Sequence, residues 1–73
     1  MTPDTLAAIG LYLYGHRWRR ELSEAMAVHR VTVNRWAESE CQMPEDLPRR
    51  LANLAQARQY AAREAERLAR QAG

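Results

Sequence analysis

The sequence predicts a small all-α fold of four to five helices with an extended C-terminal helix, and three observations predict it. Thirteen of the 73 residues are alanine, the residue with the strongest helix propensity. Apolar residues recur at steps of three and four along much of the chain, which is the period of a helix with one buried face. Residues typical of helix starts and ends separate these segments. The length allows one domain with one modest core.

The first helix is expected from about residue 3 to Tyr14. Thr2 is suited to cap it, and Pro3 is tolerated at the first helical position, where its missing N–H is not needed. Gly15 provides a left-handed ending. The expected buried stripe of this helix consists of Leu6, Ala7, Ile9 and Leu13.

Residues 19–38, RRELSEAMAVHRVTVNRWAE, fit two short helices joined by a tight turn. We expect helices from about Trp18 to Met26 and from about Arg30 to Glu38, with the turn at residues 27–29. Trp18 is expected to pack in the core. Five apolar residues can close a small core around the turn: Leu22, Met26, Val28, Val33 and Trp36. Burying them leaves His29, Arg30, Val31, Asn34 and Arg35 on the outer face of the third helix, with Thr32 at its edge.

A long last helix is expected from about Leu47 to Gln71, after a loop at residues 39–43 and a Pro-acidic start, MPEDLP. Its apolar positions alternate steps of four and three, as in a coiled-coil seam, with Arg58 at one of them: Leu47, Leu51, Leu54, Ala61, Ala65, Leu68 and Ala72. The leucines up to Leu54 are expected to pack under the domain. For residues 55–73 three interpretations stay open, namely a dimerisation arm, a solvated extension and direct contact with DNA.

The distribution of charge is more informative than the net charge of +2. All 11 basic residues are Arg. Residues 17–36 hold five Arg against two Glu, a local net charge of +3, whereas residues 37–48 hold four acidic residues and no Arg. The first basic block coincides with the two short helices, where Arg17, Arg19 and Arg20 surround a helix N-terminus and can converge on one phosphate.

Several classes of protein find no support in the sequence. A single cysteine, Cys41, excludes an internal disulfide, and His16 and His29 stand at no metal-ligand spacing from it. No phosphate-binding loop, dinucleotide fingerprint or nucleophile with a base argues for an enzyme, and no cofactor or small-molecule ligand is expected. The N-terminal apolar run is short and interrupted by Gly10, so neither a signal peptide nor a membrane span is expected, and the protein is expected to be cytoplasmic.

The segment RRELSEAMAVHRVTVNRW, followed by a short loop and MPEDLPRRL, resembles the Cro/CI-type (XRE-like) helix-turn-helix repressors of phages and mobile elements. The resemblance covers residues 5–54. It implies a DNA-binding domain at residues 1–54, a C-terminal helical extension at residues 55–73, and a homodimer that binds a palindromic operator on double-stranded DNA.

The resemblance also assigns roles to particular residues. It places Arg30, Val31 and Arg35 at base-reading positions, Asn34 beside them, Arg19 at a phosphate contact, and His29 and Thr32 against the DNA backbone. By their chemistry, Arg30 and Arg35 suit guanine, Asn34 suits adenine or phosphate, and Val31 suits a thymine methyl. Three positions depart from the family pattern. Ala27 replaces a turn glycine, Ser23 a small apolar residue, and His29 a Ser or Thr cap.

The leading hypothesis is a sequence-specific transcriptional regulator, acting as a dimeric repressor of its own or a neighbouring operon by blocking polymerase. A second hypothesis is a protein-interaction module, similar to an antitoxin or antiactivator, that binds its partner through the terminal helix. A third is an excisionase-like architectural protein, because TVNRWAESECQMP faintly resembles the recognition helix and wing of that class.

Overall fold

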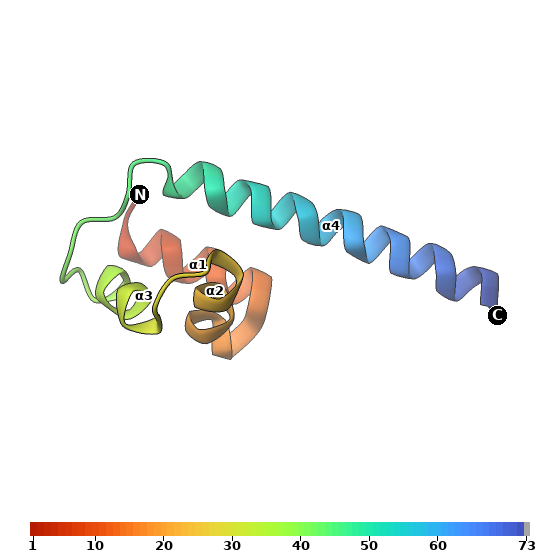
Figure 1. The fold of residues 1–73 in the computed structure, drawn as a ribbon, viewed down its shortest axis with the longest axis horizontal. Helices are drawn as coiled ribbons and strands as arrows, with labels where there is room; N and C mark the ends of the chain where they lie inside the picture. The colour runs from red at the N-terminus through yellow and green to blue at the C-terminus, as the bar shows by residue number, and fades with distance from the viewer. Residues whose placement is uncertain (73) are drawn as a thin grey trace.

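The computed structural model describes residues 1–72, and its elements within that range are all helical. They are α1 (Pro3–Tyr14), the short 3₁₀ turn η1 (Gly15–Arg17), α2 (Trp18–Met26), α3 (Arg30–Ala37) and α4 (Leu47–Ala72). The all-α class predicted from the sequence is therefore confirmed, and residues 1–72 contain no strand that could form the wing of an excisionase. Gly73, the last residue of the expected extension, lies outside the described residues. Figure 1 shows α1, α2 and α3 gathered at one end of α4, which projects far beyond them.

The bounds of α1 follow from its two ends. The backbone N–H of Thr5 donates to the hydroxyl oxygen of Thr2 at 3.1 Å, so Thr2 caps the helix as expected. At the other end, Gly15 has φ 76° and ψ −154°, and its N–H donates to the carbonyl of Leu11. The positive φ was expected, but the ψ value differs from that of a left-handed helix. Only glycine adopts this combination of φ and ψ easily.

The turn between α2 and α3 places Ala27 in the left-handed conformation, at φ 56° and ψ 42°. The N–H groups of Ala27 and Val28 donate to the carbonyls of Glu24 and Ser23 at 3.3 and 3.0 Å, which closes the end of α2. α3 then begins with no side-chain hydrogen bond from His29, so the cap at that position is weak, as the departure from the family pattern suggested. α3 ends at Ala37, one residue before the expected end.

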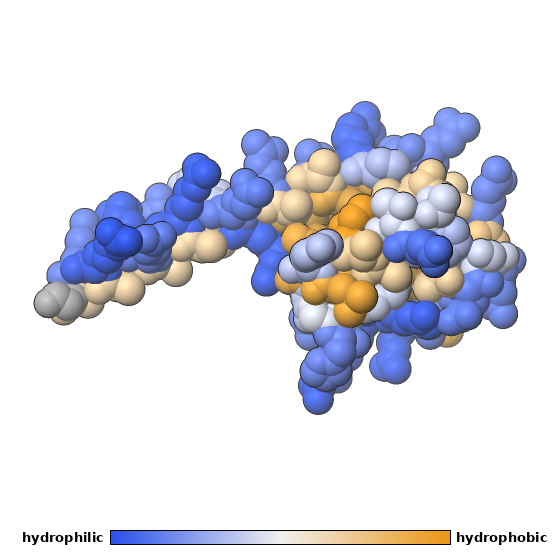
Figure 2. Space-filling view, turned by 180° about the vertical axis from the view of Figure 1, so that it is seen from behind, coloured by the Kyte–Doolittle hydropathy of each residue, from blue (hydrophilic) through white to orange (hydrophobic). Residues whose placement is uncertain are grey.

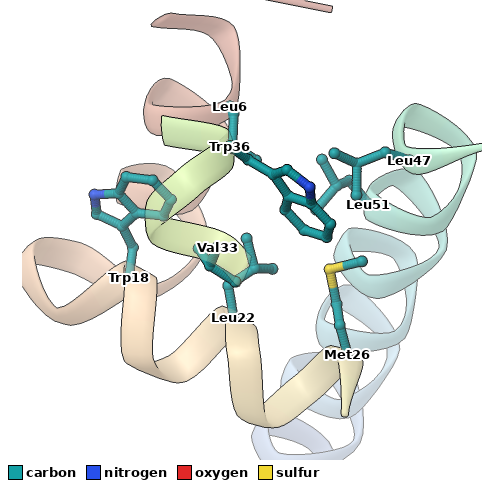
Figure 3. Packing of buried hydrophobic residues seen from close by; sticks show 8 residues of the cluster. All are labelled: Leu6, Trp18, Leu22, Met26, Val33, Trp36, Leu47 and Leu51. Atoms are coloured by element: carbon teal, nitrogen blue, oxygen red, sulfur yellow. The ribbon is translucent and has the colours of Figure 1, made fainter. Parts of the chain in front are cut away.

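One hydrophobic core joins all four α-helices (Figure 3). Trp36 of α3 points toward Leu47 and Leu51 of α4, and Leu22 lies beside Val33 (Figure 3). Val28 is half-buried and packs against this cluster. The buried hydrophobic residues are Leu6, Trp18, Leu22, Met26, Val33, Trp36, Leu47 and Leu51. Burial of Trp18 confirms the packing role expected for it.

The buried face of α1 differs from the expected stripe. Leu6 and Gly10 are buried, whereas Ile9 and Leu13, like Ala7, are only half-buried. The difference arises because the indole of Trp18 packs directly on the backbone of α1 at Gly10. The most deeply buried face of α1 therefore runs through Leu6 and Gly10, and Ala7 and Ile9 of the expected stripe pack against the core while remaining half-buried.

α4 has a packed first part and a free second part. It begins after a turn in which the N–H of Leu47 donates to the carbonyl of Pro44 at 3.2 Å. Beyond Leu51 and the half-buried Leu54, the guanidinium of Arg58 stacks 4.8 Å from the centroid of the Tyr14 ring. Residues 59–72, which we call the arm, are exposed apart from half-buried Glu64. No helix among the described residues has the length and apolar character needed to cross a membrane.

Candidate nucleic-acid interface

The starts of α2 and α3 together surround an open depression of about 480 Å³ that is lined mainly by basic side chains. Its lining residues are His16, Arg17, Trp18, Arg19, Arg20, Arg30 and Asn34. The start of α2, where the helix dipole is positive, lies at the same place, although the N–H of Trp18 itself donates to the carbonyl of Gly15. We call this feature the basic depression. Its charge and donor content suit an anionic group such as a phosphate.

The basic depression brings together residues that the sequence analysis assigned to two different roles. Arg17, Arg19 and Arg20 were expected at phosphates, and Arg30 and Asn34 at bases. They meet because the left-handed turn at Ala27 folds α3 back across α2. A single DNA strand that passed this depression would therefore meet phosphate-binding and base-reading side chains side by side.

Two of these arginines are tied to carboxylates within the protein. A terminal nitrogen of Arg19, Nη2, lies 3.0 Å from Oε1 of Glu38, and Nε of Arg20 lies 3.3 Å from Oε1 of Glu24. Both pairs are exposed to solvent, so each contributes little to stability and leaves the remaining N–H groups of the arginine available. The guanidinium of Arg19 also lies 5.4 Å from the centroid of the Trp18 ring, which limits its range of orientations.

Three other basic residues of the interface are free of such pairing. None of the ion pairs formed within residues 1–72 includes Arg17, Arg30 or Arg35. All three side chains are exposed. Their charge is therefore not neutralised locally, which is the state that attracts a polyanion.

The remaining predicted site residues lie outside the lining of the basic depression. Val31 is 52% exposed, and His29 and Arg35 are exposed beside it, whereas Thr32 is half-buried. All four belong to α3 or to the residue directly before it, so they extend the same surface along one helix.

Two residues at this surface were not placed there by the sequence analysis. His16, in η1, lines the basic depression, and Glu38 binds Arg19 across 19 residues of sequence. Glu38 is the residue directly after α3 and stands four residues after Asn34, a spacing that was the only signal in the sequence for it. Its partner on another helix depends on how α2 and α3 cross.

Other features of the described residues offer no metal or catalytic chemistry. Cys41 is exposed and free, and residues 1–72 contain no group of three or more metal-ligating side chains. A second open depression of about 570 Å³ lies between the start of the chain and the loop before α4, where Trp36, Met43 and Pro44 contribute to its lining.

Comparisons with protein-family models, with curated proteins and with solved structures found no match to this chain.

Proposed function

We propose that the protein is a sequence-specific DNA-binding transcriptional regulator, a homodimeric repressor that reads a palindromic operator through α3. The observation that carries this proposal is the basic depression, in which the start of α2 and the outer face of α3 form one surface. Arginines that carry no internal carboxylate partner within residues 1–72, Arg17, Arg30 and Arg35, supply the charge. Such a protein acts where the DNA is, in the cytoplasm of a bacterial cell.

The outer face of α3 supports reading in the major groove. An α-helix fits that groove. The exposed side chains of Arg30 and Arg35 can donate to guanine, and that of Val31 can contact a thymine methyl. In this proposal the residues around the start of α2, together with His29 and Thr32, hold the flanking phosphates. With this division of roles, phosphate contacts fix the position of the protein on the duplex, and base contacts determine which DNA sequence it binds.

The arm supports a homodimer. Residues 59–72 continue the packed helix α4 but are themselves exposed apart from half-buried Glu64, so the surface of the arm is open to a partner. Figure 2 shows hydrophilic side chains gathered along one edge of the arm and less polar residues along the other. The seam positions expected from the sequence within the arm are Ala61, Ala65 and Leu68. Pairing of two arms would bury this edge.

A gel-shift titration tests the proposal directly. The full chain is titrated against the intergenic DNA upstream of its own gene, with scrambled competitor DNA and at two salt concentrations. We expect a discrete complex that resists the competitor. The variant Arg30→Ala/Arg35→Ala is expected to lose at least about 30-fold in affinity for that site, because each base contact is worth roughly 1 to 3 kcal/mol. Arg63→Ala/Arg70→Ala, which removes the same charge from the arm, is the matched control.

The arm also favours a second candidate function, a protein-interaction module of the antitoxin or antiactivator type. Its apolar edge has no cover within residues 1–72, and a different protein would bury it as well as a second copy would. Weak binding that is lost with salt on every DNA tested, together with a monomeric full chain, is the result that would favour this candidate over the repressor.

A further inference from the structure

The open face of the arm continues the face that α4 buries under its own domain. α4 is one continuous helix from Leu47 to Ala72, in which Leu47 and Leu51 are 0% and 1% exposed. A side chain recurs on the same side of an α-helix after about 18 residues, or five turns. Ala65 therefore lies on the same side of α4 as Leu47, and Ala69 on the same side as Leu51. Figure 1 shows α1, α2 and α3 on the lower side of α4, and Figure 2 shows the less polar residues of the arm along its lower edge.

This alignment limits how two arms can meet. In a two-fold symmetric pair of parallel helices, every residue lies opposite the same residue of the partner. The seam would then bring residues 47–54 of the two chains together as well as the arms. That part of the seam is already covered by the chain's own core, because Leu47 and Leu51 are buried in it and half-buried Leu54 packs against it. Two straight parallel helices would therefore place the partner's α4 in the space that this chain's domain occupies.

Arg58 opposes a parallel pair independently. It stands at the seam position between Leu54 and Ala61, so parallel arms would set two guanidinium groups against each other. In the structure its guanidinium instead lies 4.8 Å from the centroid of the Tyr14 ring, at the end of α1. An antiparallel pair that begins beyond Arg58 leaves this contact in place and brings no second arginine to it.

We propose that two copies of this chain pair through their arms in antiparallel orientation, with the C-terminal end of each arm directed toward the domain of the other copy. The proposal rests on the proposed function and deepens it by naming the orientation of the dimer. The register that begins beyond Arg58 sets Ala61 opposite the partner's Ala72, and Ala65 opposite the partner's Leu68. Each leucine then lies over an alanine, which leaves room for it between the two helices.

The residues that border the seam are compatible with this register. Ala62 lies opposite the partner's Ala69, and Glu64 lies opposite the partner's Gln71, so neither border sets like charges against each other. Glu64 is bound within its own chain, where its Oε2 lies 2.9 Å from Nη2 of Arg67. The carboxylate nearest the seam therefore keeps its partner when the arms pair.

Antiparallel pairing places the two copies of α3 far apart. In this register the two Leu51 positions lie about 46 Å apart along the pair, at about 1.5 Å per residue. Trp36 of α3 points toward Leu47 and Leu51 (Figure 3), and α3 lies beside the start of α4, at the end away from the arm (Figure 1). The two α3 helices are then at least about 46 Å apart, whereas one turn of DNA spans about 34 to 36 Å. We expect the half-sites of the operator to be centred more than one turn apart.

Disulfide cross-linking of the full chain tests the orientation. All variants carry Cys41→Ser, because Cys41 is exposed and free and would itself react. Ala61→Cys and Ala72→Cys are oxidised separately and as an equal mixture, and the products are separated on a non-reducing gel. In the antiparallel pair two residues 61 lie about 16 Å apart along the axis, as do two residues 72, whereas a disulfide requires Cα atoms within about 7 Å. Each variant alone should stay uncross-linked, and the mixture should form a disulfide between positions 61 and 72.

Two substitutions in both chains of the mixture show that the cross-link reports pairing of the arms. Leu68→Asp places a charge in the middle of the seam and should abolish the cross-link. Gln59→Asp adds the same charge away from the seam and should leave the cross-link in place. Circular dichroism establishes that each variant is folded, and sedimentation equilibrium measures the oligomeric state of the wild-type chain.

Four outcomes overturn the proposal. Cross-linking of Ala61→Cys on its own would show parallel arms. A wild-type dimer whose mixed variants do not cross-link would show that the copies meet through another surface or register. Half-sites centred one turn apart, in a hydroxyl-radical footprint of the complex with DNA, would contradict the separation of the α3 helices. A monomeric wild-type chain would overturn the homodimer of the proposed function as well, so that failure is distinguishable from a wrong orientation.

Discussion

The indole of Trp18 lies against the backbone of Gly10, so that a Cβ atom on Gly10 would overlap the ring. This contact joins α1 to the start of α2, where Arg17, Arg19 and Arg20 line the basic depression. Because Trp18 is 6% exposed and its neighbours in sequence form that surface, the position of the ring also determines where these arginines lie. The absence of a side chain at residue 10 is therefore a requirement of the candidate interface.

Gly10→Ala is expected to lower the free energy of unfolding by up to about 2 kcal/mol. Alanine is favoured over glycine in a helix by about 1 kcal/mol, but forcing a methyl group against a packed ring costs roughly 1 to 3 kcal/mol and displaces α2 as well. Urea unfolding followed by tryptophan fluorescence measures the change. Ala8→Gly, at an exposed position of α1, calibrates the propensity difference within this helix. A Gly10→Ala protein more stable than wild type would contradict the contact.

Ala27→Gly is expected to stabilise the protein by about 0.5 to 1 kcal/mol. Ala27 has φ 56°, a left-handed conformation that costs a residue with a Cβ about 1 to 2 kcal/mol, whereas glycine adopts it freely and loses only part of this gain as backbone entropy. Thermal unfolding by circular dichroism measures the shift. Ala25→Gly, two residues earlier and within α2, should instead destabilise by about 1 kcal/mol. Equal destabilisation by both would mean that the turn is not left-handed.

Arg17→Ala is expected to weaken binding to every DNA by a similar factor and to reduce the salt dependence. A phosphate contact releases about one counterion, so the slope of log K against log salt concentration should become less negative by about 1. Arg17 is suited to this role because it lines the basic depression and is exposed. Filter binding on specific and random DNA over a salt series gives both slopes. A change confined to one sequence would assign Arg17 to base reading instead.

Leu68→Asp is expected to convert a dimeric full chain into a monomer. Leu68 is 57% exposed within the chain and lies in the seam of the arm, where pairing would bury a charge placed there. Gln59→Asp adds the same charge on the arm away from this seam and should leave the dimer intact. Sedimentation equilibrium of the three proteins decides the matter. If the wild-type chain is monomeric over the accessible concentrations, the homodimer is wrong.

The ends of the helices were largely predictable from the sequence because local signals define them. Thr2 caps α1, Gly15 ends it with a positive φ, and the turn at residues 27–29 separates α2 from α3 as expected. The ion pairs along the arm, Glu64 with Arg67 and Glu66 with Arg70, also follow from i,i+3 and i,i+4 spacing. Each of these features depends on residues within about one helical turn of one another.

The arrangement of the candidate site was only partly predictable. The sequence supplied the basic residues around the start of α2 and along α3, because charge and helical period show them to be exposed. Arg19 of α2 contacts Asn34 within α3 and Glu38 directly after it, 15 and 19 positions away in sequence, so no periodicity indicates these contacts.

The sequence by itself determined the helical class, the position of most helix ends and the apolar residues that close the core around the turn, since these depend on propensity, capping and the helical repeat. The tertiary structure decided that Gly10 joins Leu6 on the buried face of α1, with Ile9 half-buried against the core, and that Arg19 contacts Asn34. The physical reason is the same in both cases. The angle and depth at which two helices pack come from the shapes of all the side chains between them, and a large ring such as that of Trp18 selects the one site without a side chain.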